Sequence, residues 1–190
     1  SMVEKATATR AEISDAANAV FDHTDAIMLS NETAVGKYPF RATKTLTKVA
    51  LTVEGEMQQH EELIENLTAS KKHLTPLNAT CLNACELAVD TKADALVVYT
   101  EDGYTAQQVA KHRPYTPIII IAKKEKTLRE LTLVWGLNNL YKANISGKGA
   151  KKIEKILDFL RKNKLVKKRQ KIVIVCNASQ KEKLISTFTI

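Results

Sequence analysis

The stretch Asp25-Ala-Ile-Met-Leu-Ser-Asn-Glu-Thr-Ala-Val-Gly-Lys-Tyr-Pro39 decides how the first part of the chain folds. Residues 26–29 form an apolar run with the length of one buried strand. The run ends in the polar residues 30–33, and Gly36 and Pro39 follow before a long helical pattern. A strand, a polar loop and a helix make half of a βαβ unit. Polar side chains at the C-terminal end of such a strand commonly belong to a site.

Apolar residues at spacings of three and four predict a helix on each side of this stretch. The first helix covers residues 9–22, where Thr9 and Glu12 have the spacing of a capping box. The second covers residues 40–59 and follows Pro39, a residue that the first turn of a helix tolerates. The first part of the chain is therefore expected to be an α-β-α segment.

The polar residues 58–72 mark a boundary, and we expect one domain over 1–70 and a second over 71–190. Strands and helices alternate in the second domain, which predicts a three-layer α/β/α sandwich with a mostly parallel five-stranded sheet. The last strand follows its predecessor after a short turn, so it is expected to be antiparallel. The expected strands cover residues 94–99, 117–121, 140–143, 171–176 and 184–190. One expected helix starts after Thr75, a second runs to about His112, and two more cover 126–134 and 151–164.

The composition of the 190 residues is that of an ordinary soluble globular chain. It contains no apolar run of the roughly 20 residues that a membrane span requires, and no signal pattern, so a cytoplasmic location is expected. Cys81 and Cys85 lie four apart on a helical pattern, which favours a core face. A metal would need two further ligands, and His73 is the only candidate nearby, so we expect no metal in this chain.

The net charge of +8 comes from lysines that concentrate in residues 148–155 and 162–171. A nucleic-acid surface is one interpretation of this pattern. Aromatic residues make up only 5% of the chain, however, and the usual nucleic-acid reader motifs do not occur. We therefore expect a solvated helix face with affinity for phosphorylated metabolites, and neither nucleic acid nor membrane as a partner.

A second informative stretch is Thr100-Glu-Asp-Gly-Tyr-Thr105, which joins an expected strand to an expected helix. Free N–H groups at the start of a helix attract anions, and Gly103 lets the backbone bend there. Plain helix capping is the alternative, because Thr105 and Gln108 have the spacing of a capping box. The physical chemistry alone favours capping.

The first stretch resembles the signature around the eighth barrel strand of the pyruvate kinase family, Met-Leu-Ser-Gly-Glu-Thr-Ala-x-Gly-x-Tyr-Pro. Asn31 stands where the family has glycine, and Ala8 stands where the preceding family helix has proline. The resemblance continues more loosely to the C-terminus. The residues that match are Met28, Leu29, Ser30, Glu32, Thr33, Ala34, Gly36, Tyr38 and Pro39, preceded by Thr9-Arg-Ala-Glu12, Asp15, Asn18 and Ala19.

The resemblance implies a C-terminal fragment of a glycolytic transferase that moves a phosphoryl group from phosphoenolpyruvate to ADP. The first domain would be the end of a (β/α)₈ barrel, and Ser30 and Glu32 would lie at the rim of its active site. The family's metal-binding carboxylates and catalytic lysine lie on earlier barrel strands, so no catalytic residue is carried over. Mg²⁺ and K⁺ are implied for the ATP-forming parent enzyme, and no cofactor is expected in this chain.

The family loop Thr-x-x-Gly-x-Ser/Thr binds an effector phosphate in allosteric members, and Thr100, Gly103 and Thr105 match it. Asp102 adds a negative charge that repels phosphate. The tryptophan and arginine that complete the family's pocket are missing here, so a monophosphate is expected in place of fructose 1,6-bisphosphate. The lysines that can substitute as point charges are Lys148, Lys151 and Lys181.

Residues 184–190 are expected to form an edge strand that pairs with its own copy across a twofold axis. The family implies a dimer for this fragment and a tetramer for the parent, whereas an edge that is covered or solvated is the alternative.

Two other functional classes stay open. One is a stand-alone module that binds phosphorylated metabolites, and the other is a basic RNA-associated α/β protein.

Overall fold

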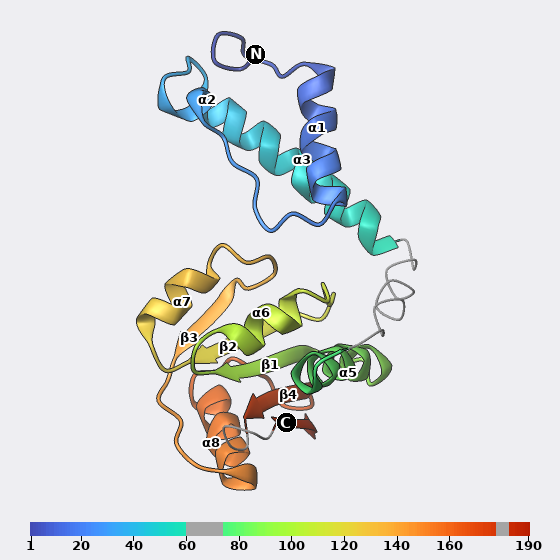
Figure 1. Cartoon of the computed structure of the whole chain (residues 1–190), viewed down its shortest axis with the longest axis vertical. Coiled ribbons are helices and arrows are strands. Elements are labelled where there is room, and N and C mark those ends of the chain that lie inside the picture. The colour runs from blue at the N-terminus through green and yellow to red at the C-terminus, as the bar shows by residue number, and fades with distance from the viewer. Residues whose placement is uncertain (60–73, 178–182) are drawn as a thin grey trace. The chain divides into compact units, whose positions relative to one another are not determined.

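The computed structural model describes residues 1–59, 74–177 and 183–190 (Figure 1). The chain divides into two compact units, Ser1–Asn66 and Leu67–Ile190, and each is described by itself. The boundary expected between residues 70 and 71 lies outside the described residues, so the two domain ranges stay a prediction.

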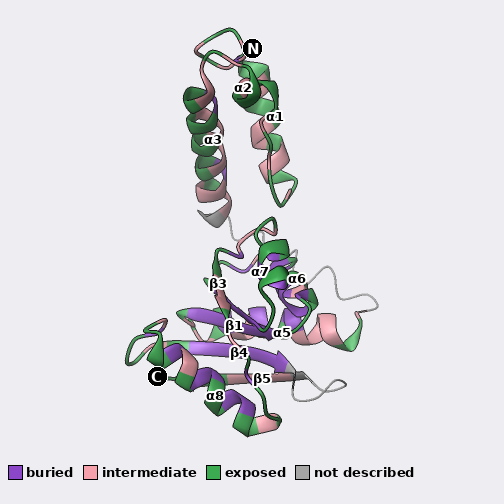
Figure 2. Cartoon of the chain, turned by 90° about the vertical axis from the view of Figure 1, so that its left-hand side faces the viewer, coloured by how far each residue is buried: buried purple, intermediate pink, exposed green. Residues whose placement is uncertain are grey.

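The first unit contains the helices α1 (Arg10–Phe21), α2 (Asn31–Ala34) and α3 (Pro39–Gln59). The capping box predicted for α1 is confirmed: Glu12 N–H donates to Thr9 Oγ1 over 3.3 Å, and Thr9 N–H donates to a Glu12 carboxylate oxygen over 2.7 Å. Helix α1 packs against α3. Few side chains of this unit are buried, as Figure 2 shows.

The strand expected at residues 26–29 does not form. Residues 26–30 have no regular secondary structure, and the polar loop that was expected after them contains the single-turn helix α2. A strand exists only through hydrogen bonds to a neighbouring strand, and the described part of this unit contains no other strand. Met28 is accordingly 87% exposed, although its sequence pattern predicts burial. The α-β-α expectation is therefore corrected to three helices.

The second unit is a five-stranded sheet in the order β3-β2-β1-β4-β5, with helices on both faces (Figure 1). All neighbouring strands are parallel except β4 and β5, which are antiparallel. The predicted fold class and the predicted direction of the last strand are confirmed. The strands are β1 (Ala95–Thr100), β2 (Ile118–Ala122), β3 (Asn139–Lys142), β4 (Lys171–Asn177) and β5 (Lys183–Thr189); the helices are α5 (Pro76–Asp90), α6 (Tyr104–Ala110), α7 (Glu125–Leu131) and α8 (Gly149–Lys162).

Two apolar layers enclose this sheet, and β1 contributes alternate residues to each. Leu96 and Val98 pack with α5, α6 and α7, whereas Val97 and Tyr99 pack with α8. Every residue of β1 is buried, as expected of a central parallel strand covered on both faces. Cys81 and Cys85 lie in the first of these layers, and burial raises the pKa of the Cys85 thiol to about 12.

The predicted helix ends differ slightly from the observed ones. The α6 helix ends at Ala110, two residues before the expected end, and α7 ends at Leu131 where residue 134 was expected. Beyond each end the backbone continues in a tighter turn, in which His112 N–H donates to Val109 and Val134 N–H donates to Leu131, so the exact last residue of each helix depends on this final turn.

Candidate functional site

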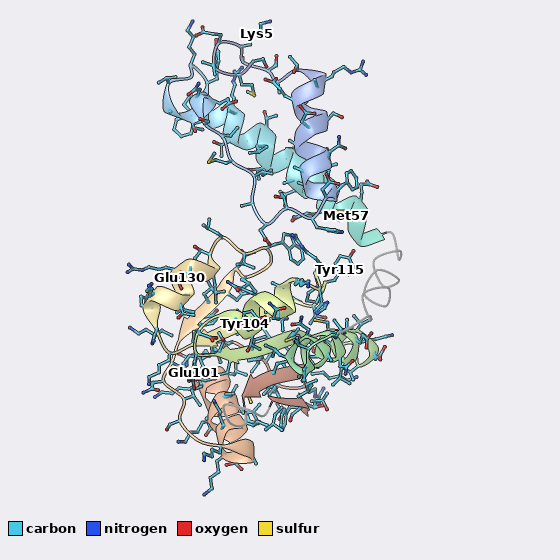
Figure 3. The ribbon with its side chains drawn as sticks, in the orientation of Figure 1. Lys5, Met57, Glu101, Tyr104, Tyr115 and Glu130 are labelled. Atoms are coloured by element: carbon cyan, nitrogen blue, oxygen red, sulfur yellow. The ribbon has the colours of Figure 1, made fainter. Side chains whose placement is uncertain are left out.

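The turn between β1 and α6 is the first candidate site, and Figure 3 marks Glu101 and Tyr104 within it. Gly103 is the N-cap of α6 and has φ 89, a left-handed conformation that favours glycine. A Cβ atom at this position would lie 3.2 Å from Thr127 Cγ2 and 3.3 Å from the Leu131 side chain. The turn therefore requires glycine for its conformation and for its close packing against α7.

Two backbone N–H groups of this turn donate within the turn itself, and Thr127 Oγ1 of α7 donates to the Glu101 carbonyl oxygen over 3.4 Å. Gly103 N–H donates to Thr100 Oγ1 over 3.0 Å, and Tyr104 N–H donates to the Asp102 carboxylate over 3.1 Å. The capping box expected from Thr105 and Gln108 does not form, because the N-cap is Gly103 and Thr105 lies inside the first turn of the helix. The carboxylate of Asp102 thus takes the backbone donor that an incoming anion would need.

The structure brings Thr100, Gly103 and Thr105 together, but it buries them. Thr100 is 0% exposed and Thr105 is 3% exposed, so neither threonine is open to solvent as a binding loop would be. Glu101, Asp102 and Tyr104 are the exposed residues of the turn. An anion that approaches from solvent meets two carboxylates before it reaches either threonine.

A buried lysine that sequence analysis missed lies beside the end of β1. Lys152 of α8 is only 5% exposed, and its Nζ lies 4.4 Å from the centre of the Tyr99 ring, in the cation–π range. Tyr99 directly precedes Thr100, and burial raises the pKa of its hydroxyl. Lys152 forms no ion pair with a carboxylate of the described residues. It therefore places an uncompensated positive charge near the carboxyl end of the sheet.

The start of α8, next to Lys152, has no side-chain cap from the described residues. Its N-cap is Lys148, which makes no side-chain capping bond, and Gly147 and Gly149 both have positive φ. Lys155 Nζ donates to the Ser146 carbonyl oxygen over 2.9 Å and fixes the approach to the helix. Of the substitutes expected from sequence, Lys148 and Lys151 are exposed, and Lys181 lies outside the described residues.

The candidates of the first unit, Ser30 and Glu32, lie at α2. Ser30 N–H donates to the Glu32 carboxylate over 3.0 Å, and backbone hydrogen bonds from Glu32 and Ser30 lower the pKa of this carboxyl. Glu32 lines a pocket of about 240 Å³ between α1 and α3, together with Glu12 and Met28. The N-terminal ammonium and the Ser1 hydroxyl bond to Glu12 and lower its pKa. Both carboxylates are thus ionised hydrogen-bond acceptors.

The described residues bring no three His, Cys, Asp or Glu side chains together in a metal-binding group. We therefore assign no ligand for Mg²⁺ or K⁺ to this chain. Among the helices within the described ranges, none has both the length and the apolarity needed to cross a membrane.

Comparison with protein families decides the relationship. The model of the pyruvate kinase alpha/beta domain matches residues 78–187. The chain belongs to the pyruvate kinase family. The model of the pyruvate kinase barrel domain also matches, over residues 1–43. The resemblance found in the sequence is thereby confirmed, with barrel sequence in the first part of the chain and the alpha/beta domain in the second.

Relatives and a solved structure agree with this assignment. The pyruvate kinase of Clostridium acetobutylicum is 41% identical over 138 residues, which are 73% of this chain and 29% of that protein. The pyruvate kinase of Staphylococcus epidermidis is 40% identical over 142 residues, 75% of this chain and 24% of that protein. The crystal structure of a pyruvate kinase from Cryptosporidium parvum matches 99% of this chain and 37% of its own, with a TM-score of 0.79 and 29% identity. The chain thus spans about a quarter to a third of the proteins it matches.

Proposed function

We propose that this chain is the C-terminal part of a cytoplasmic pyruvate kinase. The parent enzyme transfers a phosphoryl group from phosphoenolpyruvate to ADP in glycolysis, and residues outside this chain hold Mg²⁺ and K⁺. The observation that carries the proposal is the alpha/beta-domain match over residues 78–187, joined to a barrel-domain match over residues 1–43. Fused to the N-terminal part of the Clostridium acetobutylicum relative, the chain is expected to complete an enzyme that forms pyruvate.

Within the parent, we assign Ser30 and Glu32 to the rim of the active site. The support is that both lie directly after the apolar run at residues 26–29 and that the Glu32 carboxylate is held by backbone N–H groups. Such a carboxylate is ionised and fixed in place. It can orient a substrate hydroxyl or ammonium group, but it does not act as a proton donor.

We infer that the second unit binds an effector phosphate at Thr100, Gly103 and Thr105. The support is the positive charge of Lys152, which is buried beside the same strand end, and the uncapped start of α8. Asp102 opposes this binding, so the ligand is expected to be a weakly bound monophosphate. The same observations fit the alternative of a stand-alone module for phosphorylated metabolites, because the second unit has apolar layers of its own on both faces of the sheet.

Replacing Lys152 is expected to weaken anion binding. The Lys152→Met variant keeps the length and the apolar part of the side chain but removes the charge, so its affinity for phosphorylated metabolites should fall at least about tenfold, which corresponds to about 1.4 kcal/mol. Isothermal titration calorimetry with inorganic phosphate, AMP and a panel of sugar monophosphates measures this. Lys111→Met, at the exposed C-cap of α6, is the matched control, and it should change the affinity less than about twofold.

Two results contradict the effector proposal. One is silence of the wild-type chain across the whole panel, with Thr105→Ala equally silent. The other is an equal loss in the Lys152 and Lys111 variants, which would indicate non-specific attraction to a basic surface. Asp102→Asn should raise the affinity, because it removes the negative charge that bonds to Tyr104 N–H.

We also propose that two copies of the chain join through β5. Among the strands that the structure describes, this one pairs only with β4, so its other side is an open edge. Ile190 donates its N–H to Gln170 and accepts from Arg169 N–H through its carbonyl oxygen, on the side of β4. Because backbone groups alternate along a strand, those of Thr187 and Thr189 point toward the open edge. Residues 186–190 carry no charge or proline that would block pairing.

The Thr187→Pro variant is expected to convert a dimer into a monomer. Proline removes an N–H on the open side and leaves the hydrogen bonds to β4 in place. Light scattering coupled to size-exclusion chromatography measures the mass, and thermal melting reports whether the fold is retained. Phe188→Leu, a change on the same strand that keeps the backbone N–H, is the control and should stay dimeric. A wild-type chain that is monomeric at all concentrations would refute the pairing.

A further inference from the structure

The end of α8, the connection that follows it and the first residue of β4 carry a dense group of positive charges, which lies where the parallel strands of the sheet begin. Residues 161–171 contain seven Lys and Arg residues and neither Asp nor Glu. All seven charged side chains are exposed, whereas Val166 is buried in the α8 layer and anchors the segment. The basic residues are Arg161, Lys162, Lys164, Lys167, Lys168, Arg169 and Lys171.

The fold brings a second loop to this segment from about 80 residues earlier in the chain. Lys171 Nζ donates to the Thr91 carbonyl oxygen over 3.3 Å, and Lys171 N–H donates to the Asp94 carboxylate over 2.8 Å. Asp94 N–H donates in turn to the Lys171 carbonyl oxygen over 2.8 Å. Lys92 is exposed in the turn between these two residues. We call residues 161–171 together with Lys92 the basic edge.

Few of these charges are neutralised within the molecule. Arg161 lies 3.9 Å from the carboxylate of Asp158, and both side chains are exposed. Within the described ranges, no ion pair involves a side chain of residues 162–169. The whole unit is also unbalanced, because residues 67–190 contain 23 Lys and Arg against 10 Asp and Glu. The basic edge therefore projects a positive potential into solvent.

The backbone of the segment is held in a defined path. Lys167 N–H donates to Gln170 Oε1 over 2.6 Å, and Arg169 N–H donates to the Ile190 carbonyl oxygen over 2.7 Å. The cations are thus attached to a fixed turn at the edge of the sheet. Less conformational entropy is lost when such a surface binds a rigid, regularly charged partner than when a flexible tail does.

We propose that the basic edge binds the phosphate backbone of a nucleic acid. Lysine and arginine contact phosphates without reading sequence, and no aromatic residue occurs in 161–171 to stack on bases, so binding is expected to be independent of sequence. A lipid bilayer fits less well, because the apolar residues of the segment, Leu165 and Val166, face the core and offer nothing for insertion. The scarcity of aromatics, which counted against nucleic acid in the sequence, excludes base stacking but not backbone binding.

This surface is independent of the proposed effector site. Thr100 and Lys152 lie toward the carboxyl end of β1, whereas Lys171 begins β4 beside Asp94 at the amino end of β1. The inference therefore does not rest on the proposed effector or on the proposed catalytic parent, and it can fail or succeed separately from both.

The test is fluorescence anisotropy of the full chain with a fluorescein-labelled, 20-base-pair duplex of mixed sequence. If about five phosphates are contacted, the slope of log K against log salt between 50 and 200 mM NaCl should be about −4.5. The triple variant Lys167→Gln, Lys168→Gln, Arg169→Gln should bind at least about tenfold more weakly at 50 mM NaCl. Its slope should be shallower by about 2.7, because three counterion-releasing contacts are removed.

The matched control removes the same number of charges at another place. Lys123→Gln, Lys124→Gln, Lys126→Gln changes three exposed lysines after the carboxyl end of β2, and it should alter the affinity less than about twofold. The double variant Lys162→Gln, Lys164→Gln changes the basic edge on the helix side. Its slope should be shallower than that of the wild type by about 1.8. Thermal melting verifies that each variant is folded.

Three results would overturn the inference. The first is no binding of the duplex at 50 mM NaCl. The second is an equal loss in the basic-edge and control triple variants, which would mean that net charge alone causes the attraction. The third is sedimentation with vesicles of phosphatidylserine and phosphatidylcholine without binding to the duplex, which would assign the surface to a membrane.

Discussion

Purified alone, the chain is expected to form pyruvate from phosphoenolpyruvate and ADP no faster than the background. Phosphoryl transfer depends on positioned metal ions and on a cationic group opposite the transferred phosphoryl. The described residues bring no metal-binding group of three side chains together, and the aligned region covers only 29% of the Clostridium acetobutylicum relative. Positioning by such groups accounts for most of the rate of a kinase, so its loss should lower turnover by several orders of magnitude.

A lactate dehydrogenase-coupled assay measures this, with Mg²⁺ and K⁺ present and with a full-length relative at equal molarity as the positive control. Host enzyme is the main source of error, so the rate is followed through two further purification steps. A rate that scales with the chain after both steps, and that disappears on removal of Mg²⁺, would show that the chain is catalytic and refute the expectation.

The fold of the second unit follows closely from the sequence because its signals are local. The residues of β1 and of β2 are apolar in succession, as strands buried on both faces require. The short connection before β5 leaves an antiparallel pairing as its only option. The expected strand at residues 26–29 has the same apolar character but no strand beside it, and Met28 remains exposed. The apolar pattern of a segment does not indicate whether a second strand lies beside it, so this strand could not be excluded from the sequence.

The turn between β1 and α6 was predicted in position, but its hydrogen bonds were not. The turn from Thr100 to Thr105 was identified by its glycine and polar residues, yet its hydrogen bonds go to Thr100 and Asp102. Lys152 was missed because lysines of a basic helix were interpreted as solvated. A signal was nevertheless present, since Lys152 precedes Ile156 by four residues and so lies on the apolar face of α8. Its position over Tyr99 comes from packing between segments far apart in sequence.

Replacing Gly103 by alanine is expected to destabilise the second unit by about 3 kcal/mol. A side chain at φ 89 strains the backbone by about 1–3 kcal/mol. The new Cβ also presses on Thr127 Cγ2 at 3.2 Å and on Leu131, and such overpacking costs about 1–3 kcal/mol more. Urea unfolding followed by the fluorescence of Trp135 measures the change, because this is the only tryptophan of the chain and it lies in the second unit.

The control for this prediction is Gly149→Ala, which separates strain from crowding. Gly149 also has positive φ, at 53, but nothing lies within 4 Å of an added Cβ. It should therefore show the left-handed backbone cost alone, about 1 kcal/mol. Both variants should keep the wild-type denaturant slope, since the surface exposed on unfolding is the same. If Gly103→Ala were no less stable than Gly149→Ala, the side chains of α7 would move aside for the new Cβ without lowering the free energy of unfolding. The packing against α7 would then not fix the turn.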